Sequence, residues 1–164
     1  MSNKKTAYIG LLVALEFIFS YIEFLIPINL GVPGIKLGLA NLVVIVAIYT
    51  LGEKTAFTLS MIRIVLVAFT FGNLSSMLYS LAGGLLSFLV MAAAKRTKLV
   101  SIKGVSVLGG VFHNVGQIGM AMLILETSQL IFYLPVLMIA GTISGLAIGM
   151  LGAMVTVRIS KVVK

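Results

Sequence analysis

The sequence contains no cysteine and no aspartate, and only four glutamates stand against twelve lysines and arginines. Without cysteine the chain can form no disulfide, no thiolate metal site and no cysteine nucleophile. Charged residues make up only 10% of the chain, whereas 60% of it is hydrophobic. Together with a mean hydropathy of +1.21, this scarcity of charge excludes an ordinary soluble domain.

Long apolar segments fill the chain instead, and short polar breaks separate them. With 164 residues the chain is one domain by length. Six helices of about 20 residues, each crossing about 30 Å of hydrocarbon, account for nearly all of its residues. Helices are favoured over a barrel because the apolar segments are continuous rather than alternating. The sequence therefore predicts an all-α integral membrane protein, a six-transmembrane-helix bundle forming a single domain over residues 1–164, with spans at 7–26, 35–51, 55–71, 74–94, 104–125 and 130–157.

Basic residues mark every second break between these segments. Ten of the twelve lie there: Lys4 and Lys5, Lys54, Lys95, Arg96, Lys98, Lys103, Arg158, Lys161 and Lys164. The other breaks, Pro27–Gly34, Gly72–Asn73 and Glu126–Gln129, carry no lysine or arginine. Because cytoplasmic loops accumulate these residues, the pattern predicts that both termini are cytoplasmic. It also explains the net charge of +8 by topology and attraction to an anionic lipid bilayer, so no nucleic-acid partner is expected.

Two basic residues fall inside spans, and an acidic residue is expected at a similar depth to each. Glu16 and Glu23 share a face of the first span, while Lys36 and Arg63 interrupt the second and third. Ionisable groups at bilayer depth are costly unless they are paired or hydrated. One hypothesis is a pair of ion pairs, Glu16 with Arg63 and Glu23 with Lys36. The other is a polar cavity, open to the outside, in which Lys36 and Arg63 attract an anionic group. The Pro27–Gly34 break is expected to form an ordered turn or a short re-entrant stretch beside it.

Neutral polar residues also gather in the half of the bundle that is predicted to face outward. The fifth span carries His113, Asn114 and Gln117, and Asn41 and Tyr79 lie in the outer halves of the second and fourth spans. These side chains could orient the polar edge of a ligand, or they could only form hydrogen bonds between helices. A lone histidine, with no second metal-binding side chain at a suitable spacing, predicts no metal site.

Small residues form continuous faces on the first and last spans. Ala7, Gly10 and Ala14 lie on the side of the first helix opposite Glu16 and Glu23, which leaves them for a partner subunit or for packing within the bundle. The last span contains a GxxxGxxxG pattern at Gly141, Gly145 and Gly149. Such spacing lets two helix backbones approach closely, and here it favours packing within the same bundle.

Several motifs carry a family resemblance that covers nearly the whole chain. They are Tyr21-Ile22-Glu23 with Leu25-Ile26-Pro27, Pro33-Gly34-Ile35-Lys36-Leu37-Gly38-Leu39-Ala40-Asn41, Leu78-Tyr79-Ser80-Leu81-Ala82-Gly83-Gly84, and His113-Asn114-Val115-Gly116-Gln117. These stretches resemble the Gx transporter family, which is also described as heptaprenyl diphosphate synthase component I. This family is in turn similar in size and topology to the substrate-binding S components of energy-coupling-factor transporters.

The second resemblance implies a function and partners. S components are six-helix proteins that bind a vitamin or related nutrient near the outer surface, and they dock on a transmembrane T subunit driven by two cytosolic ATPases. Docking uses small residues on the first helix, usually as Ala-x-x-x-Ala; the match here is Gly10-x-x-x-Ala14 instead. The resemblance therefore implies a multi-pass protein of the bacterial plasma membrane that binds a small vitamin-, flavin- or isoprenoid-like anion.

The synthase description implies a different partner. Prenyl diphosphate synthases of the helical kind hold magnesium and diphosphate with aspartate-rich motifs, which a chain without aspartate cannot form. The chain also lacks a GxxxxGK[ST] motif, so any ATP is expected to be hydrolysed by a partner. We therefore expect no enzyme activity and no cofactor. The alternative function is a non-catalytic membrane partner in isoprenoid or quinone synthesis; a stand-alone carrier is a third hypothesis, for which a homo-oligomer would have to supply the second half.

Overall fold

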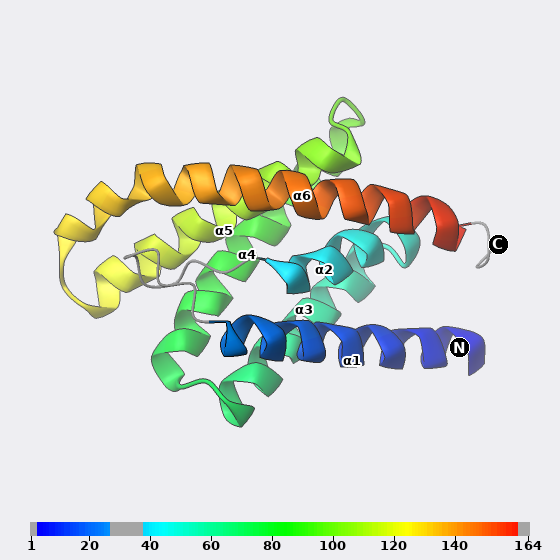
Figure 1. Cartoon of the computed structure of the whole chain (residues 1–164), viewed down its shortest axis with the longest axis horizontal. Helices are drawn as coiled ribbons and strands as arrows, with labels where there is room; N and C mark the ends of the chain where they lie inside the picture. Colours follow the sequence, from blue (N-terminus) through cyan, green and yellow to red (C-terminus); the bar gives the residue numbers. More distant parts are fainter. Residues whose placement is uncertain (1–2, 27–37, 161–164) are drawn as a thin grey trace.

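The computed structural model describes residues 3–26 and 38–160, and these form helices with no strand among them. The helices are α1 (Asn3–Leu25), α2 (Leu39–Thr50), α3 (Glu53–Thr70), α4 (Leu74–Thr97), α5 (Ile102–Ile124) and α6 (Leu134–Ser160), with a 3₁₀ helix η1 (Ser128–Tyr133) before α6. The helices pack side by side in an elongated bundle (Figure 1). The all-α prediction is confirmed, and the turn or re-entrant stretch expected at Pro27–Gly34 lies outside the described residues.

Four of the described segments are long and apolar enough to cross a membrane: Thr6–Leu25, Leu74–Thr97, Ile102–Ile124 and Ser128–Ile159. By length and composition this is a helical membrane protein. The two remaining helices differ, because α2 has only 12 residues and α3 carries three charged side chains. At about 1.5 Å per residue, α2 covers about 18 Å, roughly half the hydrocarbon thickness.

One predicted span begins differently from our expectation. The segment at 130–157 is not one α-helix, because its first residues belong to the 3₁₀ helix η1 and α6 begins at Leu134. Pro135 follows directly, and proline suits the first turn of a helix because it has no N–H to donate and a fixed φ. The proline therefore marks the start of the regular helix, four residues later than the apolar pattern predicts.

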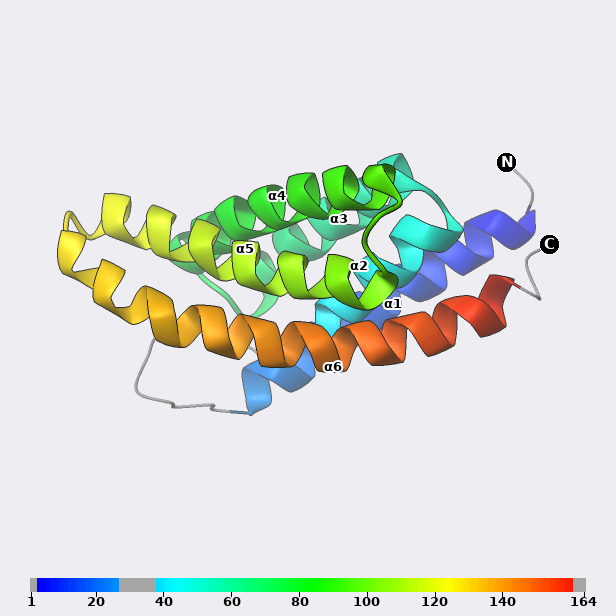
Figure 2. The ribbon, with the colours of Figure 1, turned by 90° about the horizontal axis from the view of Figure 1, so that it is seen from above.

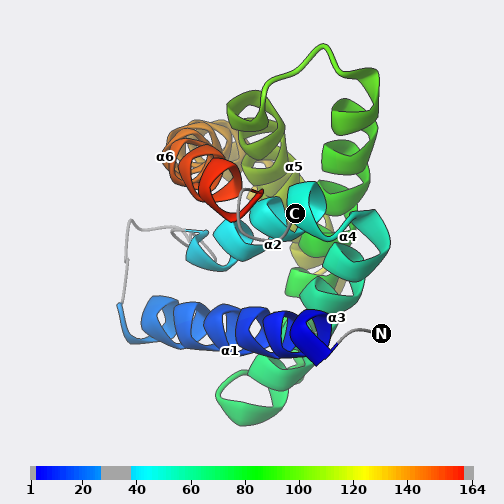
Figure 3. The ribbon, with the colours of Figure 1, turned by 90° about the vertical axis from the view of Figure 1, so that its right-hand side faces the viewer.

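Helix α2 lies at the centre of the bundle, in contact with α1, α3, α5 and α6. Every residue from Val43 to Ile48 is buried, as expected for a helix that is apolar on all sides. Glycines at both ends, Gly38 with φ 76° and Gly52 with φ 90°, adopt backbone conformations that other residues rarely take. Figure 3 shows the result, with α1 on one side of α2 and α6 on the other.

Glycines bring α5 and α6 into direct backbone contact. A Cβ on Gly145 would lie 2.8 Å from the Ser106 carbonyl oxygen of α5, and one on Gly149 would lie 2.8 Å from the Lys103 Cα. A Cβ on Gly141 would lie 2.8 Å from the Gly110 carbonyl oxygen. The GxxxGxxxG pattern therefore packs inside the bundle, as predicted.

The basic connections collect at one end of the bundle. The first turn of α1, the last turn of α6 and the α2–α3 and α4–α5 connections all lie toward the same end (Figures 1 and 2). The alternating pattern of basic residues therefore corresponds to one basic end and one end that the α3–α4 connection and η1 occupy.

Two of these basic residues also hold helices together. Lys95 Nζ donates a hydrogen bond of 2.7 Å to the Ile48 carbonyl oxygen at the end of α2, where carbonyls lack helical partners. Arg96 donates to Glu53 over 2.5 and 3.1 Å, and this ion pair lowers the pKa of the Glu53 carboxyl from its usual value. Glu53 is thus paired with Arg96 of α4.

Candidate functional site

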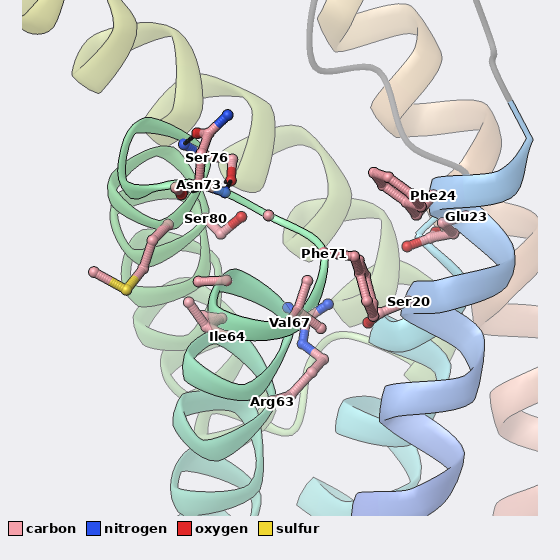
Figure 4. A pocket seen from close by; sticks show the side chains of 13 residues that line it. Ser20, Glu23, Phe24, Arg63, Ile64, Val67, Phe71, Asn73, Ser76 and Ser80 are labelled. Atoms are coloured by element: carbon pink, nitrogen blue, oxygen red, sulfur yellow. Dashed lines mark hydrogen bonds between the residues drawn. The ribbon is translucent and has the colours of Figure 1, made fainter.

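A cavity of about 240 Å³ lies between α1, α3 and α4, beside the α3–α4 connection (Figure 4). Its wall combines charged, hydroxyl and aromatic side chains. The wall includes Ser20 and Glu23 from α1, Arg63 from α3, Phe71 and Asn73 from the α3–α4 connection, and Ser80 from α4. The volume is just below the range of about 300–1,000 Å³ that is typical of pockets for drug-sized ligands.

Phe71 attaches the end of α3 to α1 and forms the aromatic wall of the cavity. Its ring centroid lies 5.5 Å from that of Phe17, 5.6 Å from that of Tyr21 and 5.1 Å from that of Phe24. The three α1 rings follow one another at spacings of four and three residues, so they share one face of the helix. Aromatic pairs at these distances stabilise the contact between the end of α3 and α1.

Arg63 reaches from α3 toward α1 in the cavity (Figure 4). Its Nε atom is buried and has no hydrogen-bond partner, and the hydroxyl of Ser20 is in the same situation. Ser20 is 7% exposed. Buried donors without partners are costly in a native protein. These two donors line the same cavity, which is what a site for an external acceptor requires.

Glu16 lies on the same face of α1 but deeper, and it is completely buried. Neither of its carboxylate oxygens has a hydrogen-bond partner. No ion pair within 4.0 Å joins Glu16 to Arg63. The contact between Glu16 and Arg63 that the ion-pair hypothesis requires is therefore absent.

Glu23 has a structural task that the sequence does not reveal. Its carboxylate accepts a hydrogen bond of 2.6 Å from the Leu39 N–H at the first turn of α2. The N-terminus of a helix favours a negative charge, since its first N–H groups lack helical acceptors. Glu23 thus links the C-terminal part of α1 to the start of the buried helix α2. Lys36, its expected partner, lies outside the described residues.

A smaller polar cavity of about 30 Å³ lies next to the first, and Glu23, Arg63 and Ser80 line both. It brings together most of the polar residues predicted from sequence: Asn41, His113, Asn114 and Gln117. Its volume is enough for about one or two water molecules. The candidate residues thus converge as expected, but this part of the site has no room for a whole ligand.

Not every predicted residue is free to serve a ligand. The Asn114 side-chain amide donates a hydrogen bond of 2.7 Å to the Leu137 carbonyl oxygen of α6, so it joins two helices. Gly83 makes room for His113 and Gln117, because a Cβ there would lie 2.8 Å from the Gln117 Cγ. Tyr79 is not among the residues that line these cavities.

Sequence reasoning missed Phe71 and Ser80. Ser76, Ser80 and Gly83 follow one another at helical spacing, so the polar face of α4 could have been recognised. Phe71 gives no comparable signal, since an apolar residue at the end of an apolar span is ordinary. Within the described residues no group of three or more His, Cys, Asp or Glu side chains could hold a metal ion.

The opposite face of α1 is open. Ala7, Gly10 and Ala14 are all exposed, and a Cβ on Gly10 would meet no atom within 4 Å. Glu16 and Ser20 on the other face are buried. The helix therefore has the two unlike faces predicted from its sequence, one toward the site and one away from the bundle.

Together these features define the class: a helical membrane protein with a polar, partly aromatic cavity near the end opposite its basic connections. The chain belongs to the heptaprenyl diphosphate synthase component I family, whose model matches residues 12–155. The resemblance to heptaprenyl diphosphate synthase component I, expected from the sequence motifs, is thereby confirmed. Its description names one component of a synthase, and so one part of a larger assembly. No curated protein and no solved structure is similar enough to the chain to count as a match.

Proposed function

We propose that this chain is the membrane-embedded substrate-binding subunit of an energy-coupling-factor-type transporter for a small anionic molecule. The observation that carries the proposal is the cavity with Arg63. A buried guanidinium Nε and a buried Ser20 hydroxyl, both without partners, line a space that is open to a ligand. Ionisable groups within a membrane usually serve function, and donors left unpaired favour an acceptor that comes from outside.

The two ends of the bundle support an orientation for this function. Basic connections favour the cytoplasm, so the cavity at the other end would open to the outside, where a nutrient is captured. Both termini would then be cytoplasmic, in a bacterial plasma membrane. Glu16 or Glu23 would balance the charge of Arg63, while Asn41, His113 and Gln117 would orient the ligand or the water around it.

Transport requires partners, because the chain has no nucleotide-binding motif. The exposed Ala7, Gly10 and Ala14 face of α1 would dock on a transmembrane T subunit coupled to cytosolic ATPases, since small residues let two helices approach closely. Ligand binding could change this contact because both sites share α1. ATP hydrolysis would have to favour one of two states with different affinity for the ligand.

Copurification tests this proposal. Tagged wild-type chain, extracted in mild detergent from its own cells, is expected to carry an ATPase pair and a T subunit. A Gly10→Leu, Ala14→Leu variant should lose them because large side chains keep the helices apart. The matched control is Ile18→Leu, on the exposed side of the same helix, which should retain them. Identical partners with all three chains, or no ATPase with any, would contradict the docking assignment.

The family description favours a second function, that of a non-catalytic membrane partner in heptaprenyl diphosphate synthesis. In that role the chain would bring a soluble prenyltransferase to the membrane, where its product is used. The same copurification distinguishes the two functions, since this one predicts a prenyltransferase in place of the ATPases.

A further inference from the structure

The cavity also indicates which class of ligand it selects. We infer that it takes a compact monocarboxylate with a planar or aromatic apolar body, and that it discriminates against diphosphates and flavins. The inference rests on the proposed binding function and narrows its substrate class. It depends on three properties of the described cavity: its donors, its neighbouring charges and its wall.

The donors match the two oxygens of one carboxylate. Arg63 supplies a buried Nε–H and Ser20 a buried hydroxyl, on two helices that face each other across the cavity. A guanidinium edge is planar and suits a carboxylate, and a neighbouring hydroxyl can donate to the same group. Charge-assisted hydrogen bonds of this kind are about twice as strong as neutral ones.

The neighbouring charges disfavour a ligand with several negative charges. Among the described residues that line the cavity, Arg63 is the one cation, and the Glu23 carboxylate lies in the same wall. A monoanion needs only the one cation that the cavity offers. A diphosphate would bring further negative charge toward Glu23 with no second cation in the described wall, and like charges at close range in a medium of low dielectric constant repel strongly.

The wall and the volume favour a small planar body. Phe24 and Phe71 line the cavity, and their rings lie 5.1 Å apart. An aromatic ligand can stack on such rings or meet them edge to face. The space of about 240 Å³ is below that of pockets for drug-sized molecules, so a flavin with its ribityl chain would not fit without rearrangement.

The absence of tryptophan from the chain provides a local reporter. A Met77→Trp variant places one fluorophore at the cavity, since Met77 lines it. A Leu99→Trp variant is the matched control, because Leu99 is 90% exposed at the α4–α5 connection, on the basic end. Both are purified in nanodiscs and titrated with benzoate, phenylacetate, dimethylallyl diphosphate and flavin mononucleotide.

Benzoate or phenylacetate should change the fluorescence of the Met77→Trp variant and leave that of the Leu99→Trp variant unchanged. In the Met77→Trp background, Arg63→Gln should weaken this binding about 10- to 100-fold and Ser20→Ala about 2- to 10-fold. The Arg63→Gln substitution leaves the Glu16 carboxylate without its nearby cation. The Arg63→Gln, Glu16→Gln double variant therefore provides a second test, and it should bind the ligand as weakly as Arg63→Gln alone.

Two results would overturn the inference. Tighter binding of dimethylallyl diphosphate or flavin mononucleotide to the Met77→Trp variant would refute the selectivity but leave the proposed binding function standing. No response to any of the four compounds, combined with no thermal stabilisation of wild-type protein by them or by a vitamin panel, would count against both.

Discussion

Replacing Gly141 by alanine is expected to destabilise the protein by about 1–3 kcal/mol. The added Cβ would lie 2.8 Å from the Gly110 carbonyl oxygen and 2.9 Å from the Asn114 side-chain nitrogen. Ordinary contacts begin near 3.4 Å, so α5 and α6 would have to separate by several tenths of an ångström. Gly145 and Gly149 are equally close to α5, so the strain cannot be relieved by a small local shift.

Three contributions determine the net effect. Overpacking costs about 1–3 kcal/mol, and losing the Asn114–Leu137 hydrogen bond adds roughly 0.6 kcal/mol, as in other membrane bundles. Alanine has a higher helix propensity than glycine, which stabilises the helix by up to about 1 kcal/mol. The matched control is Gly119→Ala in α5, where a Cβ would meet no atom within 4 Å, and only the favourable contribution applies.

Equilibrium unfolding by SDS in mixed micelles, followed by circular dichroism, measures both variants. Gly141→Ala should unfold at a lower SDS fraction than wild type, and Gly119→Ala at an equal or higher one. If the two variants differ by less than about 0.5 kcal/mol, the expected overpacking is absent, and the described contact between α5 and α6 is wrong.

Three further perturbations test other parts of the structure. Glu23→Ala should cost about 1–3 kcal/mol in the same SDS titration because it removes the charged acceptor of the Leu39 N–H, whereas Glu23→Gln should recover part of that loss. Phe71→Ala should cost about 1–3 kcal/mol because three ring contacts with α1 disappear, and increased proteolysis at the α3–α4 connection would report the loosened end. Glu53→Gln should lower the melting temperature at pH 7. Because ion pairing lowers the pKa of Glu53, the stabilisation is present above its unfolded pKa and is lost as pH falls through the folded one, so wild type and variant should melt alike in strong acid. A constant difference at all pH values would exclude the ion pair as its cause.

The apolar segments and the alternating basic breaks were enough to predict the bundle. Continuous apolar segments require helices in lipid, and the helix bounds differ from the expected ones by a few residues. The 3₁₀ start before Leu134 was not predicted, although Pro135 could have indicated it. That α2 is short, central and apolar on every side depends on packing with four other helices, which no local pattern contains.

The site was predicted in part. Rare charges in an apolar sequence identify Arg63, Glu16 and Glu23 directly, because such groups are costly in a membrane. Their geometry did not follow from depth alone, since Glu16 makes no contact ion pair and Glu23 binds the start of α2. Phe71 could not be found, because its role arises only where the ends of α1 and α3 meet.

The most direct test of the central claim is mass spectrometry of the small molecules that remain bound through purification. Wild-type protein and an Arg63→Gln, Glu16→Gln variant, extracted in parallel in mild detergent, are compared with Glu53→Gln, a charge change at the opposite end of the bundle. A small anionic metabolite is expected to remain bound to wild type and to Glu53→Gln, and to be lost from the double variant. The same molecules in all three preparations, or none in any, would contradict a ligand site at Arg63.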